Sequence, residues 1–135
     1  MSRENVEIVR RIYEGWSAND PRLMELIDPV IEVHPDPRSD WPGIEPVYRG
    51  HDRVNRYLNA IYDAFSEYRA EVEDVLDAGD QVVTLAIERA RGKQSGVPVQ
   101  IRYTAHVWTL RDGKAVRLDV NWNRAEALAA AGLQH

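Results

Sequence analysis

Residues 99–122 read VQIRYTAHVWTLRDGKAVRLDVNW, and this stretch decides the fold class. Apolar and polar side chains alternate on both sides of Asp112-Gly113, a dipeptide typical of the tight turn between two antiparallel strands. In the first strand the side chains predicted to face inward are Val99, Ile101, Tyr103, Ala105 and Val107. In the second strand they are Val116, Leu118, Val120 and Trp122. The stretch therefore predicts a β-hairpin with one face packed on a core.

Helical periodicity marks the first half of the chain. Apolar residues recur every three or four positions over residues 5–17 and again over residues 51–65, which predicts two amphipathic helices. A short helix after Pro21 and a brief strand over residues 30–34 lie between them, and an alanine-rich helix follows Asn123. Helices followed by an antiparallel meander indicate an α+β domain rather than alternating β-α-β units.

Composition excludes several classes of function. The 135 residues suffice for a single domain over residues 1–135 with a sizeable core, and the absence of cysteine removes disulfides, thiol nucleophiles and cysteine-bound metals. The net charge of −5 disfavours nucleic acid. No apolar run approaches the roughly 20 residues of a membrane span, and residues 2–11 lack the apolar core of a signal peptide. We expect a cytoplasmic domain that binds neither nucleic acid nor membrane.

Four short strings carry a family resemblance. They are NVEIVRR at 5–11, YRGHD at 48–52, WTLRDGK at 108–114 and RAEAL at 124–128. With them the chain resembles the SnoaL-like polyketide cyclase branch of the nuclear-transport-factor-two-like superfamily, over nearly its whole length. The resemblance implies a ketosteroid-isomerase-like fold, a cone-shaped barrel in which N-terminal helices pack on a strongly curved, mainly antiparallel sheet around a cavity. The superfamily contains isomerases, cyclases, dehydratases, epoxide hydrolases and non-catalytic binding proteins, so this fold does not by itself decide the function.

The resemblance also indicates a candidate general base. In ketosteroid isomerases the basic aspartate precedes a proline at the end of the first strand, and that position falls on His34, followed by Pro35. Imidazole exchanges a proton near neutral pH, so His34 is the leading candidate, against a structural histidine that closes the strand end. The tyrosine donor of those enzymes falls on Ile12, beside Tyr13, and their protonated aspartic acid falls on Ala105. Their oxyanion hole is therefore not expected in its usual form.

Tyrosines at predicted inward positions supply the second catalytic group. Tyr57 and Tyr103 could donate a hydrogen bond to a developing enolate, or could find a backbone partner in the core. The rest of the expected pocket wall is apolar or aromatic: Ile12, Tyr13, Trp16, Trp41, Ile61, Ala105, Leu118, Val120 and Trp122. Trp41 belongs to the proline-rich stretch 35–49, which is a candidate lid over the cavity.

The polar face of the hairpin has two interpretations. With the alternation above, this face consists of Arg102, Thr104, His106, Trp108, Arg117, Asp119 and Asn121. Its mixed polar and aromatic composition suits a homodimer interface on the outer sheet face, which is the interpretation we prefer. If the strand phase differs by one residue, the faces exchange and His106 and Asp119 become active-site candidates.

The expected function is acid–base chemistry without a cofactor or metal. In this hypothesis the cavity binds a small apolar or aromatic carbonyl compound and His34 removes a proton beside the carbonyl. Tyr57 or Tyr103 then stabilises the enolate during isomerisation, cyclisation or dehydration. A non-catalytic ligand-binding protein with the same cavity is the alternative.

Overall fold

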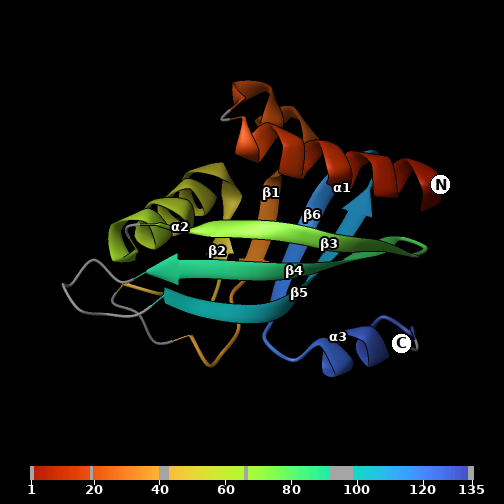
Figure 1. Ribbon diagram of the computed structural model, residues 1–135. Coiled ribbons are helices and arrows are strands. Elements are labelled where there is room, and N and C mark those ends of the chain that lie inside the picture. Colours follow the sequence, from red (N-terminus) through yellow and green to blue (C-terminus); the bar gives the residue numbers. More distant parts are fainter. Residues whose placement is uncertain (1, 19, 40–42, 66, 92–98, 134–135) are drawn as a thin grey trace.

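A bent six-stranded sheet carries helices on both of its faces (Figure 1). The computed structural model describes residues 2–18, 20–39, 43–65, 67–91 and 99–133. In chain order the elements are α1 (Ser2–Ser17), the 3-10 helix η1 (Pro21–Leu26), β1 (Ile27–His34), β2 (Tyr48–Arg49), α2 (Gly50–Ala64), β3 (Arg69–Ala78), β4 (Gln81–Arg91), β5 (Val99–Arg111), β6 (Lys114–Asn121) and α3 (Arg124–Ala130).

The strands lie in the order β2-β1-β6-β5-β4-β3. β1 runs parallel to β6, and the other neighbours are antiparallel. In Figure 1, β1 and β6 run steeply across the direction of β3 and β4, which shows how strongly the sheet is bent. The predicted α+β class, with helices packed on a curved and mainly antiparallel sheet, is confirmed; the strands of the described residues do not close into a complete barrel.

The inner face of the sheet is covered by α1 and α2. Val9, Ile12 and Tyr13 of α1 are buried, as are Tyr57 and Ile61 of α2. The three- and four-residue spacing within each set places its members on one side of its helix, facing the sheet. Together with residues of β1, β4 and β5, these side chains form the larger of two apolar clusters.

The opposite, outer face is partly covered by α3. Val83 and Leu85 of β4 and Ala105 of β5 pack there against Ala127 and Leu128. Both faces of β4 are therefore buried in its middle, and the alternation of Val83 and Leu85 marks the α3 side rather than the cavity side. Among the described helices, none combines the length and the apolar character that crossing a membrane would need.

A β-bulge in the β5–β6 hairpin determines which side chains share a face. Asp112 and Gly113 have φ angles of 53° and 79°, the left-handed values that a tight two-residue hairpin turn requires. Leu110 pairs with Ala115, but Thr109 then lies opposite Arg117 rather than Val116. Val116 is therefore the extra residue that changes the register by one position.

The bulge reverses the predicted phase of β5 relative to β6. Trp108 pairs with Leu118, and His106 pairs with Val120. The apolar side of β6 therefore shares the inner face with the even-numbered residues of β5: Arg102, Thr104, His106 and Trp108. The predicted inward phase of β5 is wrong, and so is the placing of His106 and Asp119 on one face, because regular pairing through the turn would have kept them together.

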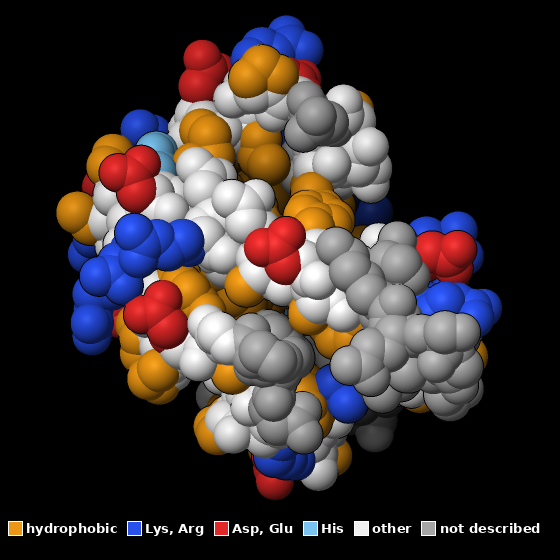
Figure 2. All heavy atoms as spheres, turned by 90° about the vertical axis from the view of Figure 1, so that its left-hand side faces the viewer, with side chains coloured by type: hydrophobic (Ala, Val, Ile, Leu, Met, Phe, Trp, Pro, Cys, Tyr) orange, Lys and Arg blue, Asp and Glu red, His pale blue; other side chains and the backbone are white. Residues whose placement is uncertain are grey.

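The surface on the α2 side of the molecule is mixed in character. Figure 2 shows charged side chains of both signs standing around this face, with hydrophobic side chains visible between them.

Candidate active site

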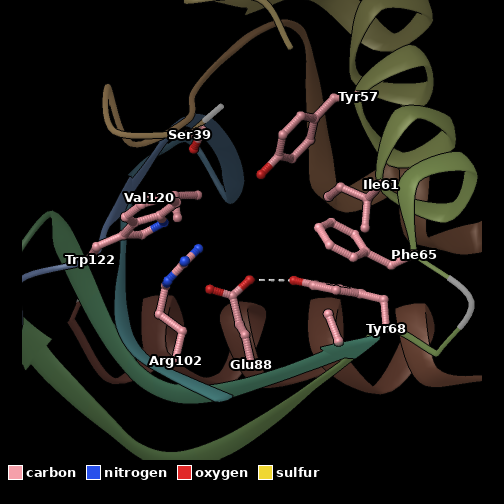
Figure 3. Close-up of a pocket in the computed structure, with 10 residues that line it drawn as sticks. Ser39, Tyr57, Ile61, Phe65, Tyr68, Glu88, Arg102, Val120 and Trp122 are labelled. Atoms are coloured by element: carbon pink, nitrogen blue, oxygen red, sulfur yellow. Dashed lines mark hydrogen bonds between the residues drawn. The ribbon is translucent and has the colours of Figure 1, made fainter. Parts of the chain in front are cut away.

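A cavity lies between α2 and the inner face of the sheet (Figure 3). The described residues that line it are Ser39, Tyr57, Ile61, Phe65, Tyr68, Glu88, Ala90, Arg102, Val120 and Trp122. Its volume is about 40 Å³. Aromatic rings and aliphatic side chains make most of the wall, and Glu88 and Arg102 bring one charge of each sign into it.

Glu88 is the acidic group of the cavity. It lies on β4 directly across from Arg102 of β5, and its side chain is 16% exposed. The hydroxyl of Tyr68 donates a hydrogen bond to its Oε1 atom, drawn as a dashed line in Figure 3. Its Oε2 atom lies 3.9 Å from Nε2 of His106. The carboxylate therefore faces the cavity while side chains behind it hold its orientation.

These contacts keep the Glu88 carboxyl ionised. Burial raises its pKa, but interaction with His106 and the hydroxyls of Tyr68 and Thr104 lowers it by more, so the pKa of Glu88 lies well below its usual range. Burial in turn raises the pKa of the Tyr68 hydroxyl, and the negative charge of Glu88 adds to that effect. At neutral pH the site holds a carboxylate and a protonated phenol.

A chain of hydrogen bonds lies behind Glu88 and ends at His106. Trp108 Nε1 donates to the Tyr13 hydroxyl over 3.1 Å, and that hydroxyl lies 2.5 Å from Nδ1 of His106. Burial raises the pKa of the Tyr13 hydroxyl, so the phenol keeps its proton. On the other side of the imidazole, Nε2 faces Oε2 of Glu88 at 3.9 Å. Thr104 Oγ1 lies 3.4 Å from the same nitrogen.

Tyr57 and Arg102 face the cavity with unused hydrogen-bonding capacity. The Tyr57 hydroxyl points into the cavity in Figure 3 and has no hydrogen-bond partner in the described part of the chain. Burial raises its pKa, so it stays a proton donor. The guanidinium carbon of Arg102 lies 3.4 Å from the ring centre of Trp122. The cavity thus combines a carboxylate, a phenol donor and a stacked cation.

His34 lies outside this cavity. Ile31 and Val33 of β1 are buried in the core, so the alternating positions Glu32 and His34 point to the other face of the sheet. Nε2 of His34 lies 2.9 Å from Oε1 of Glu32, and its side chain lines a separate hollow beside α3. The prediction of an inward-facing His34 is wrong, because the buried residues of this strand occupy the odd positions.

Some of the other predicted site residues line the cavity and some do not. Tyr57, Ile61, Val120 and Trp122 line the cavity, as the periodicity of their elements predicts. Tyr103 is 57% exposed on the opposite sheet face, and Ala105 packs beneath α3, so neither reaches the cavity. Both residues were misplaced because the predicted inward phase of β5 was the wrong one.

Four further predicted residues lie beside the cavity or in the core. Tyr13 is in the hydrogen-bond chain, Ile12 belongs to the inner apolar cluster, and Leu118 packs against that cluster. Trp16 donates from Nε1 to the Tyr62 hydroxyl over 2.9 Å and lines a neighbouring hollow. Trp41 lies outside the described residues.

Sequence reasoning missed Glu88, Tyr68 and Arg102 as cavity residues. Glu88 is the charged residue among the otherwise uncharged even-numbered positions of β4. It pairs with Arg102 of β5 in the sheet register. The available signal was the run of polar and aromatic residues on the even positions of β5, but a regular hairpin assigned that run to the outer face. In the described ranges, no group of three or more histidine, aspartate or glutamate side chains is arranged to hold a metal ion.

Comparison with known proteins agrees with this architecture. The family model of the SnoaL-like domain matches residues 9–118. No curated protein matches the chain. Many solved structures are similar to this chain. The three described below share so little sequence with it that the likeness shows the fold alone.

Three of these structures illustrate the range. An NTF2-like protein of unknown function from Burkholderia pseudomallei is 21% identical, with a TM-score of 0.78 over 93% of this chain and 95% of that one. A putative SnoaL-like polyketide cyclase from Jannaschia sp. is 21% identical, with a TM-score of 0.71 over 99% and 95%. A protein with a ketosteroid isomerase-like fold from Catenulispora acidiphila, in complex with trimethylamine, is 16% identical, with a TM-score of 0.70 over 95% and 94%.

Proposed function

The chain belongs to the SnoaL-like domain family, and we propose that it is an enzyme that moves a proton on a small carbonyl compound held in the cavity around Glu88. The observation that carries this proposal is an ionised, largely buried carboxylate in the same apolar cavity as the Tyr57 hydroxyl, which has no hydrogen-bond partner among the described residues.

The first step transfers a proton from carbon to Glu88. The carboxylate takes a proton from the carbon beside the carbonyl, and the electron pair of that C–H bond moves to form the enolate. Tyr57 donates a hydrogen bond to the enolate oxygen, and the charge of Arg102 stabilises it. His106 and Tyr68 keep the carboxylate oriented through this step.

The second step returns the proton or uses the enolate. Glu88 can give its proton back at another carbon, which isomerises the substrate. Alternatively, the enolate carbon attacks a second carbonyl of the substrate and closes a ring, and the alkoxide that forms takes the proton of Glu88. Expulsion of a hydroxyl from the neighbouring carbon, with the proton of Glu88 leaving in the water formed, gives dehydration. Each outcome is balanced in protons and electrons, and none needs a cofactor.

A carboxylate with a low pKa is a weak base, and this favours one group of substrates. Proton transfer is efficient when the acid and the base are matched in pKa, so Glu88 suits a carbon whose proton is already acidic. The same low pKa, together with the small volume of about 40 Å³, favours the second candidate function, a binding protein that holds a ligand without converting it.

Deuterium exchange separates the two functions. The protein is incubated in D₂O with cyclic 1,3-dicarbonyl compounds and aromatic ketones, and exchange beside the carbonyl is followed by NMR. Glu88→Gln keeps the side-chain size and is expected to lower the rate by about 10²–10⁴-fold. Glu7→Gln, an exposed position on α1, is the matched control and leaves the rate unchanged. Equal exchange by wild type and Glu88→Gln would reject the enzyme and leave the binding protein.

The proposal includes a cytoplasmic homodimer that forms through the outer sheet face. Support comes from Ile101 and Tyr103, which are 51% and 57% exposed on that face. Large apolar side chains that gather on an exposed sheet surface are typical of interfaces. Light scattering at micromolar concentration tests this part, and a monomeric mass would reject it.

A further inference from the structure

We propose that the substrate carries a negatively charged oxygen beside its reacting carbonyl, as a carboxylate or an acidic enol, and that Arg102 binds this oxygen. This inference rests on the proposed function for the identity of the reacting carbonyl, but the binding step can be measured without any reaction.

Arg102 differs from the other partly buried arginines of the described chain. Three arginines there are partly buried: Arg89, Arg102 and Arg124. Arg89 pairs with Glu71 at 3.2 Å and Arg124 pairs with Glu73 at 2.5 Å. Arg102 forms no ion pair with any carboxylate of the described residues. A partly desolvated cation without a counter-ion is costly, and an anionic ligand would offset this cost.

Glu88 does not fill this role, although it lies directly across from Arg102 in the sheet register. Its Oε1 atom accepts the hydrogen bond of Tyr68, and its Oε2 atom faces His106 at 3.9 Å. The negative charge of Glu88 is therefore held by groups behind the cavity. The cation of Arg102 remains available at the cavity wall.

The guanidinium is also held in a favourable orientation. Its carbon lies 3.4 Å from the ring centre of Trp122, so the planar group stacks on the indole. In Figure 3 its nitrogens point into the cavity, toward the space between Glu88 and Tyr57. A stacked guanidinium presents its N–H groups along its edge, the geometry that binds a carboxylate through two hydrogen bonds.

Two hydroxyl donors lie on the same cavity. Tyr57 has no hydrogen-bond partner among the described residues, and the buried hydroxyl of Ser39 has none either. Together with Arg102 they line the cavity with hydrogen-bond donors. Such a lining fits a ligand that is rich in acceptor oxygens.

The remaining lining restricts the shape of the ligand. The rings of Tyr57, Phe65 and Trp122 present flat surfaces to the cavity. The volume of about 40 Å³ is well below the roughly 150 Å³ of a cavity that holds benzene. A one-ring ligand therefore fits only if Arg102 and Trp122, which are both partly exposed, move outward as the stacked pair that they form. The flat rings of the wall indicate a small, planar, conjugated anion.

Arg102 also makes proton removal from an anionic substrate feasible. Without a counter-ion, a negative charge beside the carbonyl would hinder this step, because the enolate adds a second negative charge. Pairing with Arg102 neutralises the first charge and stabilises the second, so that the weakly basic Glu88 can remove the proton. Arg102 would then both select the substrate and promote the proton transfer.

Calorimetric titration with benzoate and benzamide tests the inference. The two probes have nearly the same shape but differ in charge. We expect wild type to bind benzoate at least about tenfold more tightly than benzamide. Arg102→Gln should abolish this preference. Arg111→Gln, at an exposed arginine of the same strand, is the matched control and should keep it.

A second variant guards against loss of structure. Arg102→Lys retains the charge without the flat, forked group, so it should keep a reduced preference for benzoate. Dimedone and cyclohexanone, an acidic 1,3-diketone and a neutral ketone, distinguish an enol from a carboxylate as the preferred anion. Equal affinities for benzoate and benzamide, binding of neither, or a preference that survives in Arg102→Gln would each overturn the inference.

The anion site and the proposed enzymatic function can fail independently of each other. Glu88→Gln should bind benzoate at least as well as wild type, because it removes a negative charge from the cavity. Benzoate binding without deuterium exchange would reject the enzyme and retain the anion site. Exchange with equal binding of benzoate and benzamide would do the reverse.

Discussion

The Nδ1 atom of His106 lies 2.5 Å from the hydroxyl oxygen of Tyr13, although 93 residues separate them in the chain. This contact joins α1 to β5 behind the cavity and continues through Trp108 on one side and Glu88 on the other. It holds the imidazole so that Nε2 faces the carboxylate of Glu88 at 3.9 Å. An internal hydrogen-bond chain thus fixes a side chain that lies directly behind the proposed base.

Removing the Tyr13 hydroxyl should destabilise the protein. In Tyr13→Phe, Trp108 Nε1 loses its acceptor and His106 Nδ1 loses its donor, and both groups are buried. We expect a loss of about 1–3 kcal/mol in the free energy of unfolding, measured with urea. Tyr62→Phe is the control, because Tyr62 is 46% exposed and water can replace its hydroxyl. Equal losses for the two variants would contradict the role given to Tyr13.

The stability of the fold should depend on pH through Glu88. The pKa of Glu88 is lowered in the folded state, so its contribution is fully present above the unfolded value of about 4.3 and is lost as the pH falls through the folded value. Urea unfolding of wild type should therefore show a steeper decline in stability below about pH 4.3 than Glu88→Gln, which retains other carboxylates with a lowered pKa, such as Asp36. Parallel profiles for the two proteins would show that Glu88 has the same pKa folded and unfolded.

Asp36 should stabilise the cavity wall from outside it. This carboxylate is 2% exposed, accepts hydrogen bonds from the backbone and side chain of Arg38, and accepts another from the backbone N–H of Trp122 at 2.7 Å. Asp36→Ala leaves that N–H unsatisfied and should cost about 1–3 kcal/mol in thermal or urea unfolding.

A matched control for this prediction is Asp119→Ala. Asp119 pairs with Arg117 at 2.8 Å in a more exposed position. Its loss should cost no more than about 1 kcal/mol. A larger loss of stability in Asp119→Ala than in Asp36→Ala would contradict this prediction.

Replacing His34 should leave the proposed reaction intact. The imidazole pairs with Glu32 on the face of the sheet away from Glu88, and its side chain is 23% exposed. His34→Ala is expected to change the deuterium-exchange rate less than about twofold, well under the loss that removal of a general base causes. A rate loss as large as that of Glu88→Gln would return the base to His34.

Deleting Val116 tests whether the register of β5 and β6, rather than the bulge itself, positions the cavity residues. In the deletion variant Arg117 follows Ala115, so Thr109 still pairs with Arg117, Trp108 with Leu118 and His106 with Val120. Because the paired side chains keep their faces, we expect cooperative thermal unfolding, followed by circular dichroism, with a loss of stability of about 0.5–3 kcal/mol. Val116→Ala retains the bulge and is the matched control, with a smaller expected loss. Loss of the cooperative transition in the deletion variant alone would show that the bulge itself is required.

The architecture could be predicted from the sequence because its signals are local. The three- and four-residue spacing of Val54, Tyr57 and Ile61 places one side of α2 on the core, and Asp112-Gly113 marks the hairpin. Family strings add the order of the elements. On this basis four of the predicted site residues do line the cavity: Tyr57, Ile61, Val120 and Trp122.

The polar part of the site could not be predicted in the same way. Alternation with a period of two says which residues of a strand lie together, but it does not say which of the two faces is the inner one. β4 is buried on both faces in its middle, so Val83 and Leu85 gave no indication that Glu88 faces the cavity.

The sequence by itself therefore determined the fold class, the helix faces and the apolar wall, since these depend on spacing within single elements. The tertiary structure alone decided the face of β5 and the meeting of Glu88 with Tyr68, His106 and Tyr13. One extra residue at Val116 shifts the pairing of β5 and β6 by one position, and this shift brings His106 inward and leaves Tyr103 outside. The physical reason is that register belongs to a pair of strands, and a bulge resets it without disturbing the alternation of either strand.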